Sequence, residues 1–430
     1  MPVSLQSAGL HLRLVQAATI NDVMETFHTP NHSVLAPFTI RSFRFQWPAD
    51  LLTSWAFEME TLILGWYVLV ETNSVFLLTA FGSLQFVGTL ISPMFGVVAD
   101  RVGRRLVLCT MRVGYTAMAV AIMVPALGDV LDPYWVLVVA FLAGMVRPSD
   151  IVMRNSLIGD TVPGPWLAKA MGLSRTTMDS ARIAGALVGA GLFATLGIGP
   201  AYVGVTILYL FSSALTFGVD GPQRNRPLGS DSPWQELTAG LRYIWHSPQV
   251  LALMLLAFLV NLTAYPVIMG LLPYVAREIY GVDQNGLGHL VAGCALGALL
   301  GSMIMIKIGD LYRPGRIIIL GIITWYLALA VFALQDAKWF GLIVLLIIGG
   351  LQSFAMIAMS VALLQITPER FRGRIMGVRM LAVYGMPLGL LGTGVLVEWC
   401  GFAITVWLYA VIGILCTVWI TWRWRHDIWR

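Results

Sequence analysis

The sequence has few charged side chains: they make up 11% of its 430 residues, while hydrophobic residues make up 58%. Soluble domains carry about 25% charged residues. A chain of this length cannot cover a water-facing surface with so few charges, which excludes a soluble domain and a disordered chain. The net charge of +5 fits the basic cytoplasmic loops of a membrane protein better than a nucleic-acid-binding surface. Of these classes of protein, the composition therefore indicates an integral membrane protein.

Cysteine is also scarce. The four cysteines, Cys109, Cys294, Cys400 and Cys416, lie in or beside apolar runs and lack metal-ligand spacing, so we expect neither a disulfide scaffold nor a metal site. The sequence also lacks a phosphate-binding loop of the Gly-x4-Gly-Lys-Ser/Thr type, a Ser-His-Asp arrangement and an HExxH motif. We therefore expect no enzyme, no cofactor and no direct use of ATP.

About twelve apolar runs are long enough to cross a bilayer as helices. The predicted spans are Trp47–Val70, Val75–Ala99, Leu106–Leu127, Tyr134–Ile158, Met171–Thr195, Tyr202–Val219, Val250–Ala276, Leu287–Ile308, Ile317–Leu334, Trp339–Ile366, Ile375–Val397 and Phe402–Trp422. The predicted fold class is therefore an all-α integral membrane protein with twelve transmembrane helices in two six-helix halves.

The basic residues orient these spans. If both termini are cytoplasmic, most of the 27 Lys and Arg residues fall on the cytoplasmic side, and the other side holds Arg277 and Lys338. Because positive side chains favour the cytoplasmic face, we expect a multi-pass protein of the bacterial inner membrane with both termini in the cytoplasm. The predicted segments are a cytoplasmic N-terminal segment 1–44, a first half 45–219, a cytoplasmic linker 220–248, a second half 249–425 and a tail 426–430. The linker residues 234–246 fit an amphipathic surface helix.

The two halves resemble each other at one constant offset. Met171-Gly172 recurs as Met376-Gly377, Pro163 as Pro368, and Gly189 as Gly394. Parallel repeats of this kind are related by an axis along the membrane normal, and their substrate binds near the midplane between the halves.

One loop carries a family resemblance. Residues 96–105, with the sequence GVVADRVGRR, resemble the signature loop between helices 2 and 3 of the major facilitator superfamily of transporters, and the segment 310–316 echoes it. The resemblance implies twelve helices and a cytoplasmic charge cluster that latches the halves and is remade during alternating access. The implied latch residues are Gly96, Asp100, Arg101, Gly103, Arg104, Arg105, Asp310, Arg313 and Arg316.

A second segment resembles one particular group within this superfamily. Residues 365–377, QITPERFRGRIMG, are similar to the loop before helix 11 in the third drug:proton antiporter group, which includes macrolide-efflux and enterobactin-exporter proteins. This implies proton-coupled export of an amphipathic small molecule such as a drug, siderophore or metabolite. Drug antiporters often carry a Gly-Pro pair in helix 5, which the run 185–191 lacks. Uptake of a metabolite by the same fold and a non-transporting membrane sensor or scaffold therefore stay as alternatives. We expect a monomer, with a proton or sodium as coupling ion.

Charges inside the spans are functional candidates, because each costs about 2.5–3.5 kcal/mol at a helix centre. Glu58 and Glu60 lie near the middle of the first span on different helix faces. A buried carboxylate can hold a proton at neutral pH and can offer a counter-charge to a cationic substrate. We favour Glu60, whose helix face is more polar; the alternative is that one glutamate pairs with an arginine on another helix.

Further candidates lie on later spans. Arg147 and Asp150 in the fourth span, and Asp179 and Arg182 in the fifth, have spacings that allow opposite charges to pair along a helix. We interpret them as an interhelical polar network or, alternatively, as an anion site or proton relay. The family plan, in which helices 1, 4, 7 and 10 line the cavity, adds Asn261 and Gln352 as implied substrate contacts.

Small residues and prolines predict local backbone features. Gly185 and Gly189 in the fifth span predict close helix packing. Pro266 and Pro273 predict a bent seventh span.

Overall fold

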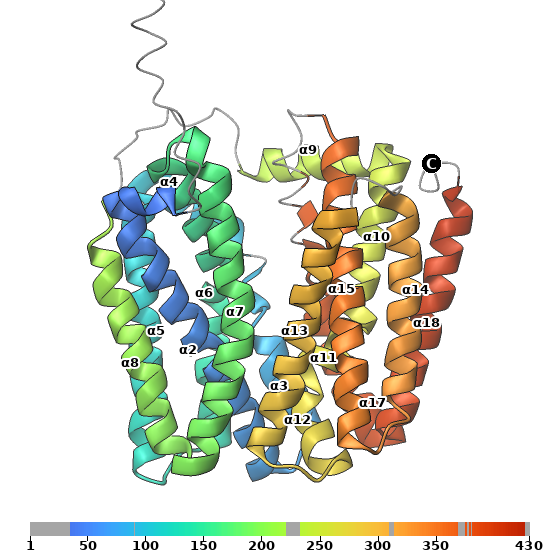
Figure 1. Ribbon diagram of the computed structural model, residues 1–430, viewed down its shortest axis with the longest axis horizontal. Helices are drawn as coiled ribbons and strands as arrows, with labels where there is room; N and C mark the ends of the chain where they lie inside the picture. The colour runs from blue at the N-terminus through green and yellow to red at the C-terminus, as the bar shows by residue number, and fades with distance from the viewer. Residues whose placement is uncertain are drawn as a thin grey trace, which may run out of the picture.

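The computed structural model describes residues 35–89, 91–220, 233–308, 314–368, 375, 378–379 and 381–425. Two helical bundles stand side by side, and α9 lies across one end of the molecule (Figure 1). The first bundle contains η1 (Ala36–Thr39), α2 (Arg41–Thr72), α3 (Val75–Leu84), η2 (Val87–Thr89), α4 (Ser92–Val102), α5 (Arg104–Leu127), α6 (Pro133–Thr161), α7 (Gly164–Leu196) and α8 (Ile198–Phe217). The second contains α10 (Pro248–Thr263), α11 (Tyr265–Gly270), α12 (Leu272–Tyr274), η3 (Val275–Ile279), α13 (Gln284–Ile308), α14 (Pro314–Phe332), α15 (Lys338–Ile366), α17 (Gly385–Cys400) and α18 (Phe402–Arg423).

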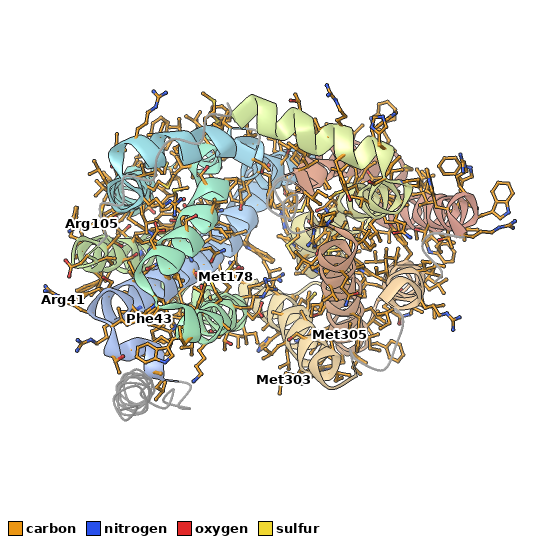
Figure 2. The ribbon with its side chains drawn as sticks, turned by 90° about the horizontal axis from the view of Figure 1, so that it is seen from above. Arg41, Phe43, Arg105, Met178, Met303 and Met305 are labelled. Atoms are coloured by element: carbon orange, nitrogen blue, oxygen red, sulfur yellow. The ribbon has the colours of Figure 1, made fainter. Side chains whose placement is uncertain are left out.

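The expected membrane crossings are present among the described residues. Eight segments are long and apolar enough to cross a membrane by length and composition. The helices α2 and α7 are longer than most but carry more charge, while α3 followed by α4 and the shorter α17 occupy the second and eleventh predicted spans. Eight segments and these four account for the twelve crossings. The amphipathic linker helix is confirmed as α9 (Pro233–His246), which runs along one edge of the molecule from the first bundle towards the second (Figure 2).

The second predicted span is present, but it consists of two helices with a break between them. Helix α3 ends at Leu84 and α4 begins at Ser92, with the short turn η2 between them. A side chain at Gly88 or Gly144 would overlap the backbone of the facing segment, so the span meets α6 with backbone against backbone there. Pro93 in the first turn of α4 then sets a new helix start.

The bent seventh span is confirmed. Helix α10 ends at Thr263, and α11, α12 and a π-helical turn continue the same crossing. Pro266 and Pro273 each lie in the first turn of a short helix, because proline cannot donate the backbone hydrogen bond that a helix interior requires.

Equivalent joints support the internal repeat. Gly197 between α7 and α8 has φ of 81°, and Gly401 between α17 and α18 has φ of 83°. Both are left-handed backbone positions that favour glycine, and they occupy the same place in each half. Gly103, with φ of 96°, makes the sharp joint between α4 and α5 inside the signature loop.

The halves meet through two equivalent helix pairs. Helix α7 packs on α13, and α17 packs on α3, as expected for a pseudo-two-fold arrangement. A side chain at Gly288 would clash with Ala190, and one at Gly394 would overlap Thr79, so both pairs pack closely. These contacts lie towards the end of the molecule opposite α9, which we call the far end.

At the far end, two charged side chains of the second half hold the turn between α2 and α3. Arg277 donates to the Leu69 carbonyl oxygen (3.0 Å) and to Asn73 Oδ1 (2.8 Å). Glu398 accepts from Ser74 Oγ and from the Phe76 amide, both at 2.9 Å. The cation therefore caps the C-terminus of α2 and the anion caps the N-terminus of α3, which suits both helix dipoles. We call these four bonds the far-end clamp.

Candidate transport cavity

The first and fifth predicted spans are in direct backbone contact. A side chain at Gly185 of α7 would come within 2.9 Å of Glu58 Cβ and 3.2 Å of the Trp55 carbonyl oxygen on α2. One at Gly189 would come within 3.0 Å of Met59. The predicted packing role of these two glycines is confirmed. Because glycine has no side chain, α2 and α7 come close together at these positions, and charged residues on neighbouring turns of the two helices face the same space.

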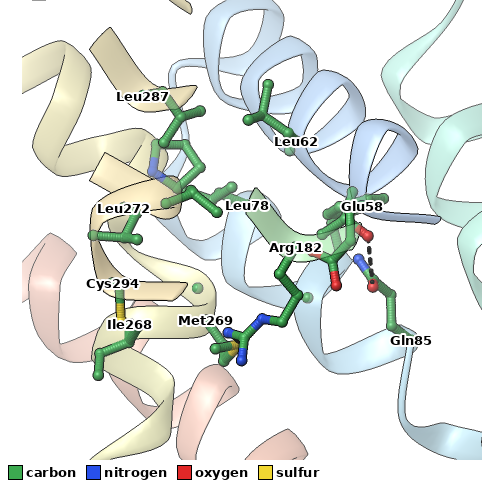
Figure 3. A pocket seen from close by; sticks show the side chains of 17 residues that line it. Glu58, Leu62, Leu78, Gln85, Arg182, Ile268, Met269, Leu272, Leu287 and Cys294 are labelled. Carbon is green, nitrogen blue, oxygen red and sulfur yellow. Dashed lines mark hydrogen bonds between the residues drawn. The ribbon is translucent and has the colours of Figure 1, made fainter. Parts of the chain in front are cut away.

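That space is a cavity between the two halves (Figure 3). Its cavity volume is about 90 Å³, and it is partly open to its surroundings. Helices α2, α3 and α7 of the first half and α11, α12 and α13 of the second half contribute its wall. Its charged and uncharged polar side chains are those of Glu58, Thr61, Gln85 and Arg182, and the rest of the lining is largely apolar.

Glu58 and Arg182 face this cavity without an ion pair. Neither has an oppositely charged group within 4.0 Å among the described residues. Arg182 Nη2 contacts the sulfur of Met269 at 3.9 Å, and Figure 3 shows the guanidinium extending towards Met269 while the Glu58 carboxylate lies nearer Gln85.

Glu60, by contrast, is fully engaged inside the first half. Its carboxylate accepts hydrogen bonds from Tyr202 (2.8 Å) and Tyr209 (2.7 Å) and forms an ion pair with Arg147 (3.1 Å). Arg147 also donates to Gln85 Oε1 at 2.6 Å, which links this network to the cavity wall. The pairing of one glutamate with an arginine on another helix is therefore the arrangement found for Glu60, and the cavity position belongs to Glu58.

A second charge network joins α2, α5 and α6 within the first half. Arg112 contacts Asp50 (2.6 Å) and Asp150 (3.2 Å), and Arg154 contacts Asp150 (2.6 Å) and Asp50 (3.6 Å). Arg112 also hydrogen-bonds Thr53 and the Ala49 carbonyl oxygen. All four charges are buried and balance to zero. The sequence analysis selected Asp150 as a site candidate but not Asp50 or Arg112, which belong to other helices. The signal that could have identified these two residues is a charged side chain within an apolar run.

Other predicted site residues lie outside the cavity wall. Asp179 pairs with Arg175 at 3.3 Å along α7. Asn261 is buried and donates to the Ala257 carbonyl oxygen one turn back (2.8 Å). Gln352 is buried, and its side-chain oxygen lacks a hydrogen-bond donor among the described residues. The assignment of Asn261 and Gln352 as substrate contacts stays a prediction.

The described part of the signature loop contacts the first half. Arg104 pairs with Asp160 at the end of α6 (2.7 Å), and Arg105 donates to the Phe217 carbonyl oxygen at the end of α8 (2.6 Å). Arg101 is exposed and Arg316 lies in the first turn of α14. Gly96 and Asp100 belong to α4, but the surroundings of these two residues, and residues Asp310 and Arg313 altogether, lie outside what the structure describes. The latch between the halves stays a prediction.

The sequence profile of the Major Facilitator Superfamily matches residues 47–385 and 254–430. The chain belongs to the major facilitator superfamily. It is therefore a multi-pass secondary transporter of a small-molecule substrate, and not an enzyme. Among curated relatives, the enterobactin exporter of Shigella flexneri is 26% identical over 313 residues, which is 70% of each chain. The enterobactin exporter of Escherichia coli O1:K1 is 27% identical over 312 residues, again 70% of each chain.

Solved structures of superfamily members share this fold. The nucleoside transporter NupG aligns with a TM-score of 0.71 at 14% identity, covering 88% of this chain and 98% of that one. A D-xylose-proton symporter aligns with a TM-score of 0.69 at 16% identity, covering 88% and 96%. At these identities the likeness shows the fold alone, and it confirms the predicted twelve-helix architecture.

Proposed function

We propose that this transporter exports an amphipathic small molecule in exchange for protons, with Glu58 as the group that couples the two. The observation that carries this is the place of Glu58: an acidic side chain in a mostly apolar cavity between the halves, without an ion pair among the described residues. A carboxylate in such a place exchanges a proton when its surroundings change between water and protein. One charge moved across 100 mV supplies about 2.3 kcal/mol.

Two further findings support this proposal. The apolar lining, with Leu62, Phe81 and Ile268 among it, suits the hydrophobic part of an amphipathic substrate. The relatives at 26–27% identity are exporters by name, and they cover 70% of this chain. In this proposal, the α9 end faces the cytoplasm, both termini are cytoplasmic, and the protein sits in the bacterial inner membrane as a monomer built of two halves, 45–219 and 249–425.

The test is flux in proteoliposomes with an imposed pH gradient and a panel of labelled amphipathic substrates. If the protein is an exporter, substrate should move from the α9 side to the far side while protons move from the far side to the α9 side. Glu58→Gln should abolish the flux that the pH gradient drives, because a neutral side chain at this position cannot exchange a proton. Glu278→Gln is the matched control, because Glu278 is a half-exposed glutamate at the far end.

Three results contradict the proposal. Full gradient-driven flux in Glu58→Gln removes the coupling role. Flux in the direction of proton movement makes the protein an importer. If the folded protein transports no substrate of the panel, and if the neutralising substitutions Glu58→Gln, Glu60→Gln and Asp100→Asn have no effect on it, the sensor or scaffold alternative is favoured. Replacing the pH gradient by a sodium gradient decides the coupling ion.

A further inference from the structure

Most charges described inside the first half are neutralised by one another. The buried pairs are Glu60–Arg147, and Asp50 and Asp150 with Arg112 and Arg154, while Asp179 pairs with the exposed Arg175. Glu58 and Arg182 differ, because each lines the cavity without an ion pair among the described residues. A charge in an apolar space needs a partner, so these two are the groups that a bound ligand would satisfy.

The two charges point to different parts of a ligand. The Arg182 guanidinium extends towards Met269 of the second half, and a thioether sulfur is a weak acceptor that leaves most guanidinium donors unused (Figure 3). The Glu58 carboxylate lies nearer Gln85, whose side-chain oxygen accepts from Thr61 (3.3 Å) and Arg147 (2.6 Å). The cavity therefore offers an anion-binding group on one side and a cation-binding group on the other.

We propose that the substrate is an amphipathic zwitterion whose anionic group binds Arg182, whose amine binds Glu58, and whose apolar body contacts the cavity wall. This rests on the proposed function in one respect, namely that the cavity is the substrate site. The ligand class follows from charge balance: a zwitterion satisfies both residues and adds no net charge to the cavity. A purely cationic ligand leaves Arg182 unpaired, and a purely anionic ligand leaves Glu58 unpaired.

The same arrangement explains exchange with protons. The substrate amine and a proton are alternative partners for the Glu58 carboxylate, so the binding of one displaces the other. The Arg182 interaction is independent of that competition. A zwitterion thus fits antiport through one carboxylate.

Equilibrium binding to purified wild-type protein, without any gradient, tests the ligand class. Three fluorescent probes share a dansyl ring and a similar linker: ε-dansyl-lysine is zwitterionic, dansylcadaverine is cationic and dansyl-6-aminohexanoate is anionic. We expect wild type to bind ε-dansyl-lysine roughly thirtyfold or more tightly than the other two, because leaving a buried charge unpaired costs at least about that factor. Glu58→Gln should shift the preference to the anion, and Arg182→Gln should shift it to the cation.

Arg175→Gln is the control, since Arg175 is an exposed arginine of the same helix outside the cavity wall and should keep the wild-type ranking. Equal binding of the three probes to wild type, binding of none, or an unchanged ranking in Glu58→Gln overturns the proposal. If the Arg182→Gln variant is not monodisperse, the Glu58→Gln variant alone tests the ligand class, because its predicted preference for the anionic probe does not depend on the result for Arg182→Gln. A correct ranking without proton-driven flux would refute only the proposed coupling, whereas proton-driven export without this ranking would refute only the ligand class.

Discussion

The far-end clamp should set the balance between the two states of alternating access. Arg277 and Glu398 both belong to the second half, and both hold the turn between α2 and α3 of the first half. These bonds can form only while the far ends of the halves are in contact. Removing them should therefore favour the state in which the far end is open.

The size of the shift follows from the exposure of these groups. Glu398 is exposed and the Arg277 side chain is 29% exposed, so solvent screens both. Exposed charged contacts contribute up to about 1 kcal/mol each. The double variant Arg277→Gln/Glu398→Gln should weaken the closed far end by about 1–2 kcal/mol, which changes the ratio of the two states roughly 5- to 30-fold. Each single variant should give about half of that free energy.

Pulsed electron paramagnetic resonance between spin labels measures this ratio. Val130 and Leu334 are exposed loop residues at the far end of the first and second half, and they provide label sites after replacement of the four native cysteines. The double variant should raise the population of the longer label distance. Glu278→Gln is the control, because Glu278 pairs with Arg277 at 3.3 Å within the second half. An unchanged distance distribution in the double variant would show that these side chains do not hold the far end closed.

Three further predictions concern packing and charge in the first half. Arg112→Met should lower unfolding stability by about 3–5 kcal/mol, because it leaves buried carboxylates uncompensated, and thermal unfolding in detergent should show the loss with Arg112→Lys recovering part of it. Gly185→Ala should lower stability and probe binding, since its Cβ would lie 2.9 Å from a side-chain carbon of α2, whereas Gly191→Ala, with open space around it, should behave as wild type in both assays. A double-mutant cycle on Arg104 and Asp160 should give a coupling of about 0.5–1 kcal/mol that decreases with added salt, and a coupling near zero would mean that this pair contributes nothing to the signature loop.

The sequence by itself determined the class of protein and most of its architecture. Long apolar runs predict helices because the bilayer supplies no hydrogen-bond partners for an open backbone. The signature loop, the repeat and the packing glycines of α7 followed from local residue types. The sequence did not show the break within the second span, which lies where η2 closely approaches α6, a contact between segments far apart in the chain.

Only the tertiary structure decided which charges belong to the site. Glu58 and Glu60 are two residues apart and equally unusual in the sequence, and the more polar face of Glu60 favoured it. In the fold, that polarity belongs to a closed network with Arg147 and two tyrosines, while Glu58 lies in the cavity beside Arg182. Helical periodicity tells which residues share a face, but the partner of that face is set by packing between helices. The chemical meaning of the few charges inside the membrane therefore comes from long-range contacts.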